Sequence, residues 1–192
     1  MALEQYGWTM NTITIRNTTP TDHERIISAM PEWWDGRDLT SAVHKIFFIH
    51  FCNTSFIAEK EKMLVGFLVA FFSQTDGDLG YIHFAGVHPG YRKEGIGRRL
   101  YKNFFNLCKA NDISTVTCCT SPVNKLSIAF HQRMGFEIEP GDSSVDGVPV
   151  TMNFLGKNEP FVLFKKRVGT SPVGRQLIPS EGRQVSANRA FL

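Results

Sequence analysis

The segment from Val87 to Leu100 constrains the fold of this 192-residue chain more than any other. An apolar run over residues 82–87 stops at His88-Pro89-Gly90, and a short loop follows that holds two cations and two glycines. A strand that passes through a glycine loop into a helix N-terminus predicts an anion site, because the first N–H groups of a helix lack partners and carry partial positive charge. The predicted helix is marked by apolar residues at helical spacing: Ile96, Leu100, Phe104, Leu107 and Cys108.

Two well-known phosphate loops do not fit these residues. A nucleoside-triphosphate loop needs Gly-Lys-Ser/Thr after its glycines, and none follows Gly97. A dinucleotide fingerprint needs a third Gly or Ala at the position of Leu100. The alternative interpretation is a plain strand-to-helix turn with a few surface cations.

A second strand–helix unit lies downstream. Residues 113–118 are rich in β-branched side chains and predict a strand, which ends at residues 120–124. The next helix is expected to stop at Gly135. Residues 136–138 then restart as a strand. The face of this helix expected to be apolar consists of Leu126, Ala129, Phe130 and Met134.

With both units in view, the chain resembles the GNAT acyltransferases, the superfamily that moves acetyl groups from acetyl-CoA to amines. The family's Arg/Gln-x-x-Gly-x-Gly/Ala loop matches residues 92–97. Its Asn…Ser/Ala…Phe-aromatic-x-x-x-Gly-Phe segment matches Asn124, Ser127 or Ala129, Phe130, His131, Gly135 and Phe136. The resemblance covers about residues 12–167. It implies an α/β (α+β) fold with a mixed, mostly antiparallel twisted sheet, a splayed strand pair and flanking helices.

The remaining pattern is typical of one domain flanked by an N-terminal extension and a C-terminal tail. A strand is expected at residues 13–16, a helix opening at Pro20-Thr21-Asp22, a helical stretch over 39–51, a hairpin of 56–60 and 63–72, and late strands at 148–154 and 161–166. We divide the chain into an N-terminal extension (1–11), an acetyltransferase domain (12–167) and a disordered tail (168–192).

Length and cysteine usage favour a cytoplasmic protein. No apolar stretch reaches the ~18 residues that a membrane span requires, and residues 1–9 lack the cationic start of a secretory signal. The four cysteines contain no Cys-x-x-Cys pair, which favours reduced thiols and no metal.

The charge balance does not indicate a nucleic-acid partner. Three arginines and one glutamate lie beyond Arg167, so the rest of the chain holds 18 basic and 17 acidic side chains. A nearly neutral body argues against nucleic-acid binding. The expected partner is an amine acceptor, either a small molecule or a protein, without nucleic acid or membrane; homodimerisation is left open.

The resemblance implies that acetyl-CoA enters between the strand ending at Val87 and the strand over 113–118. Its pantetheine would pair with main-chain groups on the first strand, and its pyrophosphate would lie on the N–H groups of residues 92–97. The expected cofactor-binding residues are Ala85, Val87, Arg92, Lys93, Glu94, Gly95, Ile96, Gly97, Arg98, Asn124 and Ser127.

Direct transfer to an ammonium group needs a base for the amine, and the departing thiolate benefits from an acid. His131 stands where many family members carry a Tyr, and we predict that it is the acid; the alternative is a helix residue that only lines the pocket. We predict His83 as the base. Tyr81, His83 and Ala85 are expected to share one strand face by the period of two. The alternative for His83 is a half-buried structural histidine.

Trp33, Trp34 and Tyr81 are the predicted substrate-binding residues. Residues 31–38 connect the first two predicted helices and place the two Trp among acidic neighbours, which suits a cationic amine. The alternative is that one Trp packs into the core while the acids cap the next helix. The sequence therefore predicts an N-acetyltransferase that moves the acetyl group of acetyl-CoA to a primary amine. A non-catalytic acyl-CoA sensor is the alternative function.

Overall fold

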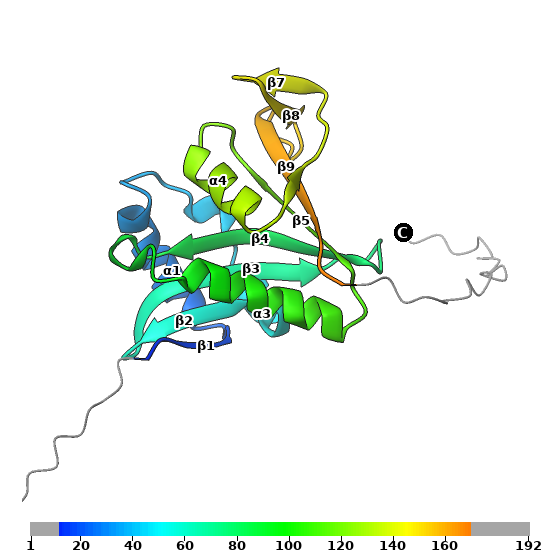
Figure 1. Cartoon of the computed structure of the whole chain (residues 1–192). Helices are drawn as coiled ribbons and strands as arrows, with labels where there is room; N and C mark the ends of the chain where they lie inside the picture. Colours follow the sequence, from blue (N-terminus) through cyan, green and yellow to red (C-terminus); the bar gives the residue numbers. More distant parts are fainter. Residues whose placement is uncertain (1–11, 170–192) are drawn as a thin grey trace, which may run out of the picture.

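A nine-stranded sheet forms the centre of the computed structural model, which describes residues 12–169 (Figure 1). The strand order is β1-β2-β3-β4-β5-β9-β8-β7, and β6 pairs with β9 beside this path. All neighbouring strands are antiparallel except β4 and β5. The strands are β1 (Thr14–Asn17), β2 (Phe56–Lys60), β3 (Met63–Phe72), β4 (Leu79–Val87), β5 (Thr115–Thr120), β6 (Glu137–Ile138), β7 (Ser143–Val145), β8 (Val148–Met152) and β9 (Pro160–Arg167).

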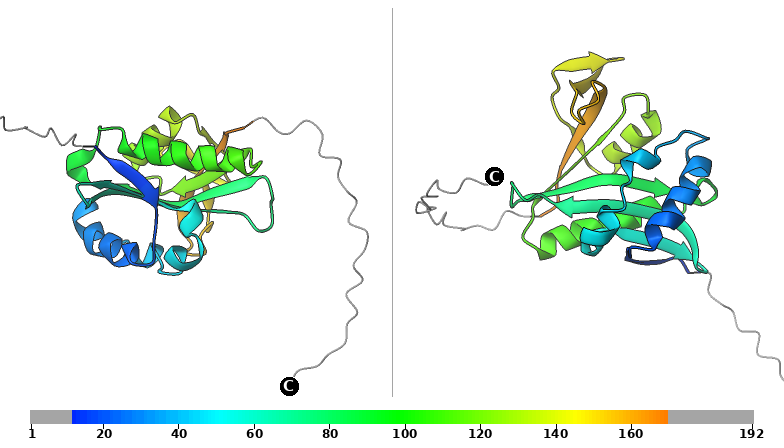
Figure 2. Two further views of the ribbon diagram at one scale, coloured as in Figure 1. Left: turned by 90° about the horizontal axis from the view of Figure 1, so that it is seen from below. Right: turned by 180° about the vertical axis from the view of Figure 1, so that it is seen from behind.

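Helices cover both faces of this sheet. Figure 2 shows α3 on one side and α1 on the other. The α-helices are α1 (Asp22–Trp33), α2 (Phe47–His50), α3 (Ile96–Ala110) and α4 (Lys125–Arg133), and the 3-10 turns are η1 (Thr40–Ala42), η2 (Cys52–Thr54) and η3 (Pro89–Tyr91). Within the described residues, no helix is long and apolar enough to span a membrane.

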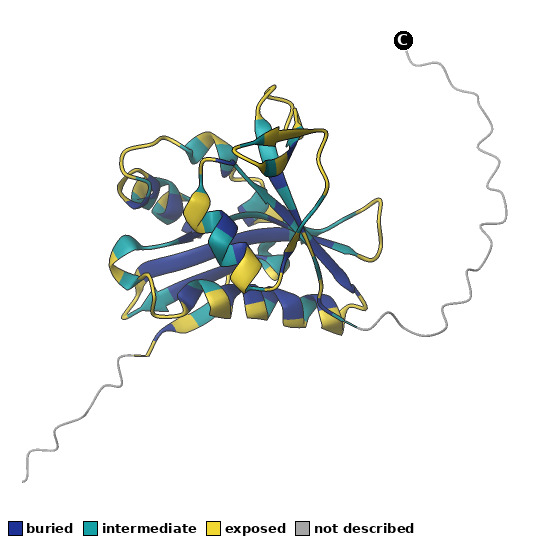
Figure 3. Ribbon diagram, turned by 45° about the horizontal axis from the view of Figure 1, so that its top comes forward, coloured by how far each residue is buried: buried dark blue, intermediate teal, exposed yellow. Residues whose placement is uncertain are grey.

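Two apolar cores hold the helices to the sheet. The core on the α3 side is the larger and includes Leu68, Ile82, Leu100, Phe104 and Phe164. The core on the α1 side includes Ile26, Met30, Trp33, Phe48 and Phe67. In Figure 3 the central strands are buried, while the outer face of α3 is exposed. This division follows the amphipathic spacing of α3, whose buried residues recur every three or four positions.

The predicted fold class is confirmed, including the mostly antiparallel sheet, the splayed strand pair and the flanking helices. The predicted N-terminal extension (1–11) lies outside the described residues, and so does the predicted tail apart from Val168 and Gly169. Val168 is buried and donates its N–H to Ser114 O, so the packed domain continues one residue past its predicted end.

Two local predictions were wrong, and one strand was missed. Residues 39–51 form no continuous helix but a 3-10 turn and a four-residue α-helix. Pro20-Thr21-Asp22 was also expected to supply an N-cap, but Thr21 makes no side-chain cap to α1. The short strand β7 was not predicted, because Ser143–Val145 is largely polar and exposed, and its pairing with β8 is its main tertiary contact.

The buried face of α4 also differs from the prediction. The helix buries Ile128 and His131, whereas Leu126 is 78% exposed. Phe130 and Met134 of the predicted face do pack against the core, so only Leu126 was misplaced, and the buried Ile128 was missed. Packing against β9 places the imidazole ring of His131 on Phe164, with 4.7 Å between ring centroids.

A bulge in β4 shapes the centre of the molecule. Val69 of β3 lies opposite Phe84, but the next residue, Ala70, lies opposite Ile82, so His83 has no partner in this register. A bulge shifts the alternation of side chains by one residue. Ile82 accordingly packs in the α3-side core, while Phe84 packs against Trp34 on the α1 side.

Candidate active site

β4 and β5 separate at the bulge. Their parallel pairing covers only Leu79–Ile82 against Thr115–Cys118, after which β4 continues to Val87 with β3 alone. His88 N–H donates to Val65 O of β3. Since successive residues direct their main-chain groups to alternate edges, those of Ala85 and Val87 point away from β3 and into the gap. This is the edge at which the sequence predicted pantetheine pairing.

The loop after β4 exposes main-chain N–H groups at the start of α3. Gly95 is the N-cap residue with φ +76°, and Lys93 has φ +77°, so two left-handed residues bend the loop around the helix N-terminus. A side chain at Gly95 would meet no atom within 4 Å, which shows that this side of the loop is open. The amides of Gly95, Ile96 and Gly97 make no hydrogen bond in the part of the chain that the structure describes. Such an arrangement suits a phosphate.

The cations around this loop divide into two groups. Arg92 donates from Nη2 to Trp33 O at 2.8 Å and more weakly to Val87 O, while Arg99 donates to Ile13 O. Arg92 therefore links the loop to the end of α1, and Arg99 links α3 to the residue before β1. Lys93 and Arg98 are exposed and make no ion pair within residues 12–169, so they are the side chains free to meet an anion.

The remaining predicted cofactor residues serve the loop and α4. Glu94 is exposed, and its N–H already donates to Tyr91 O at 3.4 Å. Ile96 is buried in the core, so it would contribute its main chain only. Asn124 caps α4, because its side chain accepts the N–H of Ser127. Gly97 lies against Phe130 of α4, since a Cβ built there would lie 3.4 Å from that ring. The two helices thus flank the gap closely.

His131 does not face the gap with a free nitrogen. Its Nδ1 lies 2.8 Å from Ser127 O, and because a carbonyl only accepts, Nδ1 carries the proton. Nε2 then accepts from Tyr101 Oη at 2.9 Å. The ring is 5% exposed, and burial lowers its pKa. These contacts do not favour the predicted role as an acid.

His83 is the first residue after the β4–β5 pairing ends. Its Nε2 lies 2.7 Å from Ala42 O, so Nε2 holds the proton and Nδ1 is the basic nitrogen. Nδ1 makes no hydrogen bond within the described residues and is not among the buried polar atoms without a partner. Burial lowers the pKa of His83, and the ring stacks on Phe47. A neutral imidazole at this position has the protonation state of a base.

The predicted common face of Tyr81, His83 and Ala85 was wrong. Tyr81 and His83 lie on the α1 side, where they contact Phe71 and Phe47, but Ala85 packs against the α3-side core. The bulge is the cause. Burial raises the pKa of Tyr81, and its hydroxyl lies 3.4 Å from Cys119 Sγ, so the phenol stays protonated.

The two tryptophans differ in burial. Trp33 is 2% exposed and belongs to the α1-side core, and Asp38 accepts the N–H of Thr40, as in the alternative interpretation. Trp34 lies across β4, where a Cβ at Gly86 would come within 2.5 Å of its ring. Only glycine permits that approach, and Trp34 packs there against Phe67 of β3 and Phe84 of β4.

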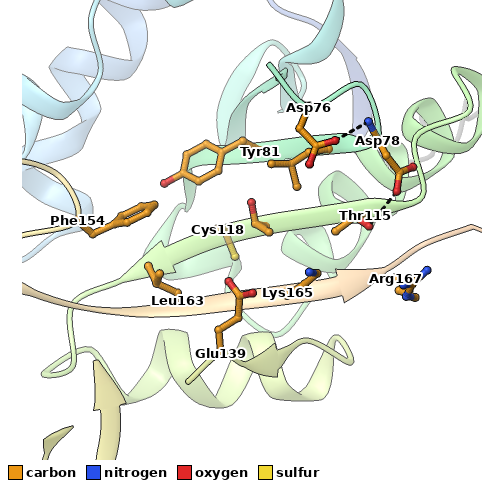
Figure 4. A pocket seen from close by; sticks show the side chains of 12 residues that line it. Asp76, Asp78, Tyr81, Thr115, Cys118, Glu139, Phe154, Leu163, Lys165 and Arg167 are labelled. Atoms are coloured by element: carbon orange, nitrogen blue, oxygen red, sulfur yellow. Dashed lines mark hydrogen bonds between the residues drawn. The ribbon is translucent and has the colours of Figure 1, made fainter. Parts of the chain in front are cut away.

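A hollow of about 510 Å³ lies on the sheet face next to Tyr81 (Figure 4). Its floor consists of aligned residues from three strands: Leu79 opposite Thr115 and Arg167, then Tyr81 opposite Thr117 and Lys165. In Figure 4, Phe154 and Tyr81 flank one end, and Asp78 and Arg167 lie at the other. Sequence reasoning missed Glu139, Phe154, Lys165 and Arg167. For Lys165 and Arg167 the only signal was the alternation of β9, which does not identify the neighbours of that strand.

Comparisons with known proteins agree with this geometry. The model of the acetyltransferase (GNAT) family matches residues 21–136. L-2,4-diaminobutyric acid acetyltransferase of Halalkalibacterium halodurans is 26% identical over 88 residues, which cover 46% of this chain and about half, 47%, of that relative. Among solved structures, Ard1 from Thermoplasma volcanium has a TM-score of 0.66 at 20% identity, covering 82% of this chain and 98% of that one. The acetyltransferase yncA from Salmonella typhimurium, solved with acetyl-CoA, has a TM-score of 0.60 at 14% identity, covering 83% and 96%.

Proposed function

The chain belongs to the acetyltransferase (GNAT) family, and from that premise we propose that it transfers the acetyl group of acetyl-CoA directly to a primary amine. The observation that carries the proposal is the separation of β4 from β5 beyond Ile82, beside a helix N-terminus with free amides. An acetyl thioester in that gap would have its acceptor side at His83.

The residues of the gap fit acetyl-CoA when each is matched to a part of that molecule. The main-chain edge at Ala85 and Val87 can pair with the amides of a pantetheine arm. The amides from Gly95 onward can receive a pyrophosphate, with Lys93 and Arg98 as nearby cations. When bound, acetyl-CoA supplies the acetyl group as a thioester.

We assign His83 the role of base. The acceptor amine is an ammonium ion in solution and must lose a proton before it attacks. Nδ1 of His83 can take that proton while Nε2 stays hydrogen bonded to Ala42 O, which fixes the ring. The lowered pKa keeps the imidazole neutral near pH 7.

We assign His131 a positioning role in place of acid catalysis. Through Ser127 and Tyr101 it connects α4 to α3, the two helices that flank the gap. Neither ring nitrogen is free to donate a proton to the departing thiolate. Solvent at the open gap can supply that proton.

The acceptor is a small-molecule amine or a protein amine. The similarity to a diaminobutyric acid acetyltransferase favours a small molecule, although it spans only about half of that relative. The four cysteines are free thiols, and we propose the cytoplasm as the compartment. A non-catalytic acyl-CoA sensor is the alternative, and the open Nδ1 of His83 at the end of the gap favours the enzyme.

A panel of amines with acetyl-CoA, followed by release of free thiol, tests the proposal. We expect thiol release that depends on one class of amine and is at least tenfold above hydrolysis without amine. Calorimetry of CoA binding runs in parallel. Tight CoA binding without turnover on any amine would support the sensor, and absence of CoA binding would refute both functions.

A further inference from the structure

The hydroxyl group of Tyr81 lies at the point where β4 and β5 separate. Its Oη is 3.4 Å from Sγ of Cys119, the first residue of β5 beyond the pairing of Ile82 with Cys118. In Figure 4 the Tyr81 ring points along β5 towards the end of that strand. Tyr81 and Cys119 are both half-buried, so the hydroxyl borders the inner end of the gap and is not enclosed in the core.

One aromatic cluster holds Tyr81 and His83 on the same face of β4. The Tyr81 ring contacts Phe71 of β3, with 5.3 Å between ring centroids. Phe47 of α2 stacks on Phe71 and also on His83, where the centroids are 4.4 Å apart. The hydroxyl of Tyr81 and the open nitrogen of His83 therefore approach the inner end of the gap from the α1 side of the sheet.

The hydroxyl of Tyr81 has only a weak partner. The contact with Cys119 Sγ is the one hydrogen bond that it makes within the described residues. A thiol is both a weak donor and a weak acceptor. Burial raises the pKa of both groups, so a neutral phenol lies beside a neutral thiol. The phenol can exchange this contact for an acceptor that carries negative charge, because a hydrogen bond to an ionised acceptor is roughly twice as strong.

The proposed course of acetyl-CoA brings such an acceptor to the hydroxyl. With the pyrophosphate at the start of α3 and the pantetheine arm along Val87 and Ala85, the thioester lies at the inner end of the gap. The reaction forms a C–N bond and breaks the C–S bond, and the electron pair of the broken bond stays on sulfur. Negative charge therefore develops on that sulfur, beside His83 and the hydroxyl of Tyr81.

We propose that Tyr81 is a catalytic residue that donates a hydrogen bond from Oη to the departing sulfur of CoA. Tyr81 keeps its own proton. Nδ1 of His83 takes the first proton of the ammonium group, the second leaves to solvent, and solvent protonates the sulfur. A preorganised donor of this kind lowers the barrier, because the sulfur carries more charge in the transition state than in the thioester. The inference rests on the proposed function, since the bound thioester supplies the acceptor of this hydrogen bond.

Tyr81→Phe tests the inference, because it removes the hydroxyl and keeps the ring. We expect kcat and kcat/KM for acetyl-CoA to fall together by roughly 10²-fold, the usual cost of losing one preorganised donor. Cys119→Ala is the matched control, since it breaks the same hydrogen bond from the other side. Its kcat should stay close to the wild-type value. Denaturant unfolding shows that both variants are folded.

The acidity of bound CoA provides a second measurement, which does not depend on turnover. The ultraviolet absorbance of the thiolate is followed against pH with CoA bound. A donor at the sulfur favours the thiolate, so the thiol of CoA should be more acidic on the wild-type protein than in solution. Tyr81→Phe should raise the pKa of the bound thiol by about one unit or more, and Cys119→Ala should not.

The outcomes separate this inference from the proposed function. Wild-type kcat in Tyr81→Phe, or a bound thiol no more acidic than free CoA, would overturn the inference while the proposed function stands. Equal losses in Tyr81→Phe and Cys119→Ala would overturn it as well, because they would assign the effect to packing where β4 and β5 separate. Failure of the wild-type protein to bind CoA would refute the proposed function and the inference with it.

Discussion

At the scale of single residues, His83 combines an open nitrogen with a position at the end of the gap. Replacing it with Ala should lower kcat by about 10²-fold or more, because a positioned base contributes that much. The base must be neutral, and burial lowers the pKa of His83 below its usual value. The wild-type kcat/KM should therefore fall only as the pH drops below about 6.5, and the variant should lose that acidic limb.

His23 provides the control for that prediction. Its Nε2 also bonds a carbonyl of the same segment, Val43 O, at 3.1 Å, but it lies on α1 away from the gap. His23→Ala should reduce stability while it preserves the shape of the pH profile. Equal loss of the acidic limb in both variants would show that the carbonyl tether, and not proton transfer, explains the effect.

His131 should behave as a structural residue. His131→Phe leaves the buried Tyr101 hydroxyl without its partner, and such a loss costs roughly 1–3 kcal/mol, whereas Ser127 O keeps its helical N–H donor. Denaturant unfolding should show that loss, and adding Tyr101→Phe should recover part of it. A 10²-fold drop in kcat with unchanged unfolding free energy would restore His131 as an acid.

At the scale of secondary-structure elements, the start of α3 depends on the left-handed conformation of Gly95. Gly95→Val should weaken CoA binding tenfold or more, about 1.4 kcal/mol, because a β-branched residue disfavours this conformation and the loop amides would shift. Calorimetry measures the change.

Gly147 allows a matched comparison for the same backbone strain. It has φ +77° and open space around a built Cβ, but it lies between β7 and β8. Gly147→Val should cost similar stability and leave CoA affinity unchanged. If the two variants bind CoA equally well, the anion site at α3 is refuted.

At the scale of the whole molecule, an ion network joins α1 to the edge of the sheet. Asp22 is 1% exposed and pairs with Arg16 and Arg25, which also pair with Glu59. Burial alone would raise the pKa of Asp22, but hydrogen bonds from Arg16 and Thr19 outweigh it and hold the pKa well below its usual range. Burial alone would also raise the pKa of Glu59, but hydrogen bonds from Arg16 and Arg25 lower it.

A carboxylate with a lowered folded pKa stabilises the fold above its unfolded pKa, and that stability is lost as the pH falls through the folded value. The free energy of unfolding should therefore decline below about pH 4–5. Asp22→Asn should cost roughly 2 kcal/mol or more at pH 7 and flatten this decline. The control Asp146→Asn breaks only an exposed pair with Lys125 and should cost less than about 1 kcal/mol. If the unfolding free energy of Asp22→Asn declines at low pH as steeply as that of the wild type, groups other than Asp22 cause the decline.

The sequence by itself determined the helix α3 and the strand β5, and through the family resemblance the fold class. The apolar spacing of α3 and the β-branched run of β5 predict these elements correctly because each presents one face to a core. The anion site at residues 92–97 stays a prediction. The predicted separation of β4 and β5 came from the family resemblance, and the strand pairing confirms it.

Only the tertiary structure decided which side chains meet in the gap. The bulge at His83 reverses the faces of β4 beyond it, and no local pattern marks the extra residue. His131 is buried because Phe164 of β9 packs on its ring and Tyr101 of α3 bonds its Nε2, while Ser127 of its own helix accepts from Nδ1. The charged floor beside Tyr81 exists because β9 pairs with β5 across more than forty intervening residues. Contacts between segments distant in sequence depend on register and packing, and these are properties of the assembled sheet.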